Sequence, residues 1–117
     1  TSPAEPMAVE PSTSELAEKS GMSLNDQRNA RKALRKLVKN MRSAKREKWE
    51  NIVTEAIIGE IGIFSYIVAV NAKVAISEAG ADPTLCSEIV QALKDSQKLK
   101  ETLEAFSMSI NDIPFGE

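Results

Sequence analysis

The spacing of apolar residues predicts helices along most of the chain, and the longest predicted helix covers residues 24–57. Apolar residues recur there every three or four positions, which places them on one stripe of a helix at about 100° per residue. The stripe comprises Ala30, Leu34, Leu37, Val38, Met41, Trp49, Ile52 and Ala56. Ser23 is the predicted N-cap, with Asp26 three residues later, and no Pro or Gly follows until Gly59. The pattern leaves a bend near Ser43 open.

Two further helices are predicted over residues 61–79 and 83–106. The first is the most apolar stretch of the chain, as expected of a helix at the centre of a bundle. Its β-branched residues also suit a strand, but a strand needs a partner and no second run of this kind occurs. Asp82 followed by Pro83 is a strong start for the last helix, because Asp caps and Pro suits the first helical position. The inward residues expected there are Leu85, Ile89, Leu93, Leu99, Leu103 and Phe106.

Residues 1–22 differ from the rest of the chain, because Pro, Ser, Thr and Glu dominate them. Such a segment lacks the apolar area needed to offset the entropy cost of ordering it. We expect a disordered acidic arm there, with a short helical turn near Glu15–Lys19 left open. The arm is either a tail without a role or a segment that covers a partner or its own basic helix. The predicted fold class is therefore all-α, a small helical bundle of about three main helices over residues 23–117 with this arm.

The chain has no histidine and a single cysteine, and this composition disfavours several kinds of catalytic and metal-binding site. Without histidine, the usual general base and the commonest metal ligand are both missing. Cys86 lies on an apolar helix face, so we expect a buried structural thiol and not a nucleophile. The sequence therefore predicts a protein that is not an enzyme, with no catalytic residues, no metal site and no cofactor.

The cysteine content also bears on the compartment. One cysteine permits no internal disulfide, and no signal-peptide pattern stands near the start of the sequence. We expect an intracellular protein in a reducing compartment, such as the cytoplasm, the nucleus or an organelle interior, and not a secreted one.

The cations of the chain are concentrated in one segment, although the net charge of the whole chain is −2. Ten of the fifteen Lys and Arg residues fall within residues 28–48. Residues 25–48 carry ten positive and two negative charges, a local net charge of +8 that leaves −10 for the remainder. Eight of these cations share the helix face opposite the apolar stripe, over about 28 Å at 1.5 Å per residue. They are Arg28, Arg31, Lys32, Arg35, Lys36, Lys39, Arg42 and Arg46.

Like charges three or four residues apart destabilise a helix, and few acids interleave here to relieve them. We therefore predict a polyanionic partner for this face. Nucleic acid is favoured, bound through phosphates with little sequence preference, because few short polar residues stand between the cations to contact base edges. The first alternative is an acidic protein surface, including a second copy of the chain in a homo-oligomer, which would make this chain a small accessory subunit of a larger assembly.

Other partners for the basic face stay open. An anionic membrane surface is one, because a basic face beside an apolar face with Trp49 is typical of interfacial helices. Recognition by a calmodulin-like protein is another, and a solvated face without a partner is the last. A membrane span is disfavoured, because the uninterrupted apolar run over residues 61–70 is about half the length that a span needs.

Overall fold

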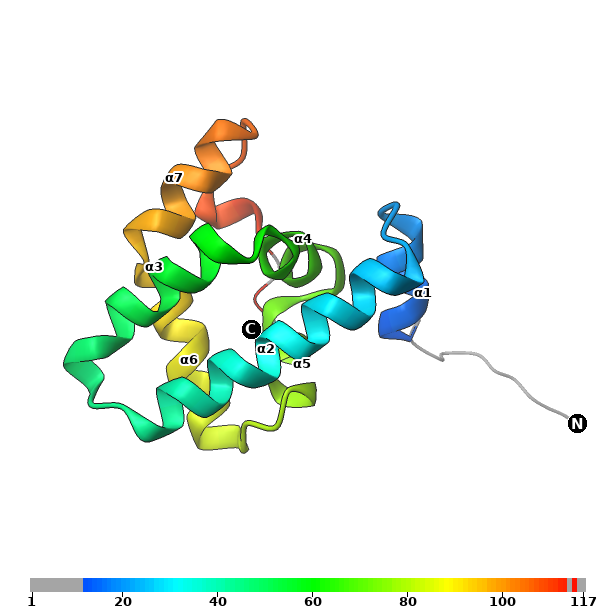
Figure 1. Ribbon diagram of the computed structural model, residues 1–117. Helices are drawn as coiled ribbons and strands as arrows, with labels where there is room; N and C mark the ends of the chain where they lie inside the picture. Colours follow the sequence, from blue (N-terminus) through cyan, green and yellow to red (C-terminus); the bar gives the residue numbers. More distant parts are fainter. Residues whose placement is uncertain (1–11, 114, 116–117) are drawn as a thin grey trace, which may run out of the picture.

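A computed structural model describes residues 12–113 and 115, and the described part is all-helical, without a strand (Figure 1). The predicted all-α class is confirmed, and the strand alternative for the apolar run is wrong. In chain order the helices are α1 (Thr13–Lys19), α2 (Leu24–Ser43), α3 (Trp49–Gly59), α4 (Ile61–Val70), α5 (Ala72–Glu78), α6 (Pro83–Asp95) and α7 (Gln97–Ala105), with 3-10 turns at Arg46–Lys48 and Ile110–Asp112.

Helix α4 lies at the centre of this arrangement and packs against α1, α2, α3 and α5. Its side chains Ile63, Tyr66, Ile67 and Val70 are buried, and Ile67 is fully so. In the view of Figure 1, α2 crosses the front of the molecule, α6 lies behind it, and α1 sits at one end. The expected central position of the apolar run is thus what the fold has, and α2 forms one wall around it.

The prediction of three main helices is not confirmed, because each predicted helix is divided in two. The expected helix over 24–57 ends at Ser43, where the bend was left open, and restarts at Trp49. Between them Ala44 is extended, with φ −108° and ψ 158°. The Met41 carbonyl near the end of α2 accepts both from the Ala44 amide at 3.2 Å and from the indole N–H of the buried Trp49 at 3.0 Å.

Polar residues divide the other two predicted helices. Asn71 separates α4 from α5 with a φ of 92°, a left-handed conformation that Asn tolerates, and its side chain accepts from the Lys73 amide at 2.8 Å. Ser96 separates α6 from α7, and its buried hydroxyl accepts from the Leu99 amide at 3.2 Å. Both side chains therefore cap the start of a new helix by accepting from one or more of its first amide groups.

One predicted core position is wrong. Phe106, expected to point inward, is 58% exposed and stacks on the Phe64 ring with centroids 5.4 Å apart. It follows the last residue of α7, where the helix has ended and its periodicity no longer holds. Ile89, Leu93, Leu99 and Leu103 are buried as expected.

The part of the predicted arm that the structure describes, residues 12–22, packs on the rest of the chain. Ser12 caps α1 by accepting from the Glu15 amide at 3.2 Å, in the region where a short turn was left open. Ala17 is fully buried, and α1 contacts α2 and α4. The disordered arm is therefore not confirmed, and its residues 1–11 lie outside the described residues.

Among the described residues, no single helix has both the length and the apolar composition to cross a membrane. One pair, Arg46–Gly59 with Gly62–Val70, meets those two criteria together, but it is bent by 101° at the break.

Candidate polyanion-binding face

The buried side of α2 determines where its cations point. Ser23 caps the helix by accepting from the Asp26 amide at 3.1 Å, as predicted. The apolar stripe then faces the core, with Ala30, Leu34, Leu37, Val38 and Met41 all buried. Because the cations occupy the opposite side of the helical wheel, the packing of α2 turns them toward solvent.

Five of the eight predicted contact residues form an exposed group on α2, which we call the free basic stripe. None of the five makes a side-chain hydrogen bond or an ion pair with another residue that the structure describes. The stripe spans about 16 Å along the helix axis, from the 1.5 Å rise per residue. It consists of Arg28, Lys32, Arg35, Lys36 and Lys39.

Arg31 is different, because its guanidinium connects three helices. Its Nε donates to the Tyr66 hydroxyl of α4 at 3.1 Å, and its Nη2 donates to Ser14 of α1 at 3.2 Å and to Gln27 at 3.4 Å. Gln27 and Tyr66 are both buried, and the Gln27 amide donates in turn to the carbonyl of Met22 at 3.2 Å. Arg31 therefore holds α1 and α4 against α2.

The last two of the eight predicted contact residues also have partners. Arg42 donates to the carbonyl of Gly80 at 2.8 Å, just beyond α5. Arg46 forms an ion pair with Glu88 of α6, and its guanidinium lies 4.4 Å from the centroid of the Trp49 ring. These contacts attach the turn after α2 to the neighbouring helices.

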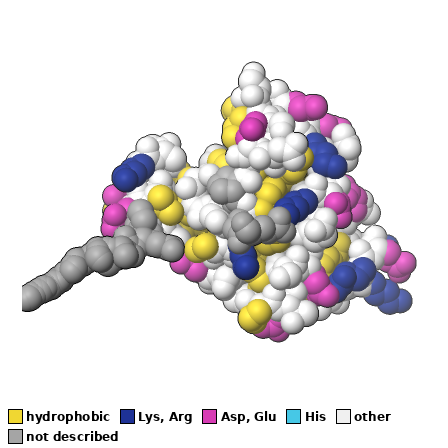
Figure 2. Space-filling model, turned by 180° about the vertical axis from the view of Figure 1, so that it is seen from behind, with side chains coloured by type: hydrophobic (Ala, Val, Ile, Leu, Met, Phe, Trp, Pro, Cys, Tyr) yellow, Lys and Arg dark blue, Asp and Glu magenta, His cyan; other side chains and the backbone are white. Residues whose placement is uncertain are grey.

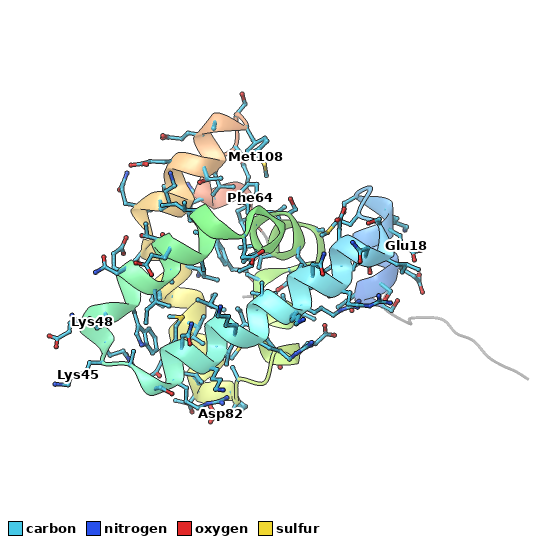
Figure 3. All side chains as sticks on the ribbon, in the orientation of Figure 1. Glu18, Lys45, Lys48, Phe64, Asp82 and Met108 are labelled. Carbon is cyan, nitrogen blue, oxygen red and sulfur yellow. The ribbon has the colours of Figure 1, made fainter. Side chains whose placement is uncertain are left out.

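The charges around the stripe are uneven. Lys45 and Lys48, labelled in Figure 3, are exposed at the turn between α2 and α3 and extend the positive charge beyond α2. On the face drawn in Figure 2, seen from behind, basic and acidic side chains are interspersed. Glu78 is the acid that lines a small hollow together with Arg31 and Arg35, but it forms no ion pair with either of them.

The chemistry that the rest of the described chain offers is limited. Burial raises the pKa of the Cys86 thiol, whose Sγ lies 3.4 Å from the carbonyl of Lys73. A raised pKa keeps the thiol protonated near neutral pH, which disfavours a nucleophile. No group of three or more acidic or Cys side chains gathers within the described ranges to hold a metal ion.

Sequence reasoning could not separate the free basic stripe from Arg31, Arg42 and Arg46. All eight cations lie on the same face of the helical wheel, and only the positions of α1, α4, α5 and α6 distinguish them. Comparison with known proteins adds no information on this face, since no protein-family model, curated protein or solved structure matches the chain.

Proposed function

We propose that the chain is a non-catalytic binding module that docks on nucleic acid through the free basic stripe of α2. The observation that supports this proposal is the stripe itself: Arg28, Lys32, Arg35, Lys36 and Lys39 are exposed on one rigid helix without an ion pair to another described residue. Holding like charges together in this way is unfavourable in the free protein and becomes favourable beside a polyanion.

The geometry suits phosphates better than base edges. Lys and Arg head groups spread over about 16 Å of helix can reach several phosphates, which repeat every 1.7 Å of duplex axis when both strands are counted. Phosphate contacts position a protein without specifying a sequence. We therefore propose binding with strong salt dependence and little sequence preference, by a protein that acts inside the cell and needs no cofactor.

Two other partners for the same stripe remain alternatives within this proposal. An acidic protein surface would make the chain an accessory subunit, and an anionic membrane would make it a peripheral protein. The buried Trp49 argues against the membrane, because interfacial helices place such a ring in the lipid and here it packs in the core.

The test is a titration of binding against salt, using a labelled duplex of about 16 base pairs, a single-stranded RNA of similar length and anionic vesicles in parallel. The variant Lys32→Glu/Arg35→Glu/Lys39→Glu removes three stripe cations and leaves the bonded arginines intact. We expect duplex affinity to fall at least 100-fold, and the slope of log K against log salt to flatten by about 2.7 from the loss of three phosphate contacts.

The matched control is Lys73→Glu/Lys98→Glu/Lys100→Glu, which makes the same change of net charge on α5 and α7. This control should keep most of the affinity and the full salt slope, because those lysines lie outside the stripe. Equal losses in the two triple variants would show a non-specific effect of net charge. Binding of vesicles alone would favour the alternative in which the stripe binds an anionic membrane.

A further inference from the structure

A groove runs beside α2, next to its buried stripe, and adjoins the free basic stripe at Lys36. It consists of two adjoining hollows of about 460 and 610 Å³, which share Gly59 and Glu60 at the junction of α3 and α4. Helix α2 lines both hollows, from Asp26 at one end to Asn40 at the other. Phe64, labelled in Figure 3, lies at the α4 end of the groove.

The floor of the groove is apolar, and several of its residues have small side chains. Leu37, Ile52 and Ile63 line it with alanines from α2 and α3. A Cβ atom placed on Gly59 would meet no atom within 4 Å, so the space above this glycine is open.

The charges of the groove are opposite to those of the free basic stripe. Glu55 and Glu60 line the hollow of about 460 Å³ with one cation, Lys36, and Asp26 joins Glu60 in the other hollow. Three carboxylates against one amine make a groove that favours a cationic occupant and repels a nucleic-acid backbone. The groove therefore suits a different partner from the stripe, although Lys36 belongs to both surfaces.

The length of the groove matches that of a helix of about four turns. Asp26 to Asn40 covers about 21 Å at 1.5 Å per residue, the length of about four helical turns. Small residues on the floor allow another helix to approach closely, and carboxylates at the edge can pair with its Lys or Arg side chains.

From these features we propose that the groove binds an amphipathic helix of a protein partner. Apolar side chains of that helix, spaced three and four residues apart, fill the hollows over Leu37, Ile52 and Ile63. Its Lys or Arg side chains pair with Glu55 and Glu60. The chain thus carries a second binding surface, which does not depend on the function proposed for the stripe.

The experiment selects displayed random peptides of about 16 residues, long enough for four turns of helix, on the full chain. Enriched peptides are then synthesised, and their affinity is measured by fluorescence anisotropy against three forms of the protein. The forms are the unaltered chain, Gly59→Leu, and Glu55→Gln/Glu60→Gln. Gly59 has no left-handed φ, so leucine can adopt its backbone conformation and fill the groove without distorting α3.

We expect enriched sequences with apolar residues at helical spacing and a net positive charge. Gly59→Leu should weaken them at least 10-fold, and Glu55→Gln/Glu60→Gln should weaken them about 3- to 10-fold. Both variants should bind duplex DNA as the unaltered chain does, which separates this proposal from the function of the stripe.

Three results would contradict the proposal that the groove binds a helix. The first is enrichment of acidic peptides that lose affinity only when stripe residues are replaced. The second is a set of peptides whose affinity Gly59→Leu leaves unchanged, and the third is no enrichment over display particles that carry no peptide. A thermal melt of Gly59→Leu at or above that of the unaltered chain confirms that any loss of affinity reflects a blocked groove and not an unfolded protein.

Discussion

The free basic stripe and the bonded arginines Arg31, Arg42 and Arg46 contain the same residue types within one short segment, yet their surroundings differ. Each bonded arginine donates to, or pairs with, a group on another helix or just beyond one, whereas the stripe cations point into solvent. A helical wheel therefore shows which cations share a face, but it does not show which of them are bonded within the fold. One part of this face holds the fold together, and the other is available to a partner.

The largest effect on stability is expected at Arg31. Replacing Arg31 with Ala removes hydrogen bonds to Tyr66, Gln27 and Ser14, and it leaves the buried Tyr66 hydroxyl and the Gln27 side-chain oxygen without a described donor. Such groups cost about 1–3 kcal/mol of the free energy of unfolding. Urea denaturation measures the loss, and Arg35→Ala, one helical turn away, is the matched control with a change within about 0.5 kcal/mol. Equal losses in the two variants would contradict the distinction between bonded arginines and stripe cations.

A smaller loss is expected from Tyr66→Phe, which removes only the hydroxyl that accepts from Arg31. The ring still fills the core, so the free energy of unfolding should fall by about 1 kcal/mol. In a double-mutant cycle with Arg31→Ala, the two losses should add to more than the loss in the double variant, by at least 0.5 kcal/mol. Strict additivity would mean that the hydrogen bond does not contribute.

Arg42→Ala should cost less again, because its bond to the Gly80 carbonyl is exposed to water. We expect a loss of about 0.5 kcal/mol or less in the free energy of unfolding. Thermal melts of this variant and of Arg31→Ala would compare the two stability losses, and we expect the larger loss at the more buried arginine. A loss at Arg42 as large as that at Arg31 would contradict this order.

The smallest effect on stability is expected at Lys39, a member of the stripe. Lys39→Ala should change the free energy of unfolding by no more than about 0.5 kcal/mol, since the side chain is exposed and has no described partner. Its effect should appear in binding instead, as a salt slope on duplex DNA that is flatter by about 0.9. A loss of stability without a change of the salt slope would mean that Lys39 stabilises the fold, as the bonded arginines do, and does not bind DNA.

Much of the fold could be predicted from periodicity. The stripe from Ala30 to Met41 is buried as expected, and the caps at Ser23 and Asp82 are where the sequence placed them. The interruptions at Asn71 and Ser96 could not be predicted, because an Asn or a Ser within an otherwise helical pattern does not by itself mark a break. At both positions tertiary packing turns the chain, and the side chain then caps the new helix.

The site was predictable as a face and not as individual contacts. Arg31 and Arg35 are four residues apart on the same side of α2, and nothing in their local sequence distinguishes them. The partners of Arg31 lie 17 positions earlier at Ser14 and 35 positions later at Tyr66, so only the folded chain reveals them. The groove was missed for the same reason, because its walls come from α2, α3 and α4 together.

The most direct test compares salt slopes of duplex binding for two double variants. Lys32→Ala/Lys39→Ala removes two stripe cations, and Arg42→Ala/Arg46→Ala removes two bonded ones, with the same change of net charge. We predict a slope flatter by about 1.8 for the first variant, and a change of less than about 0.5 for the second. Equal changes in the two slopes, or no change in either, would contradict the claim that the free basic stripe of α2 is the surface that binds nucleic acid.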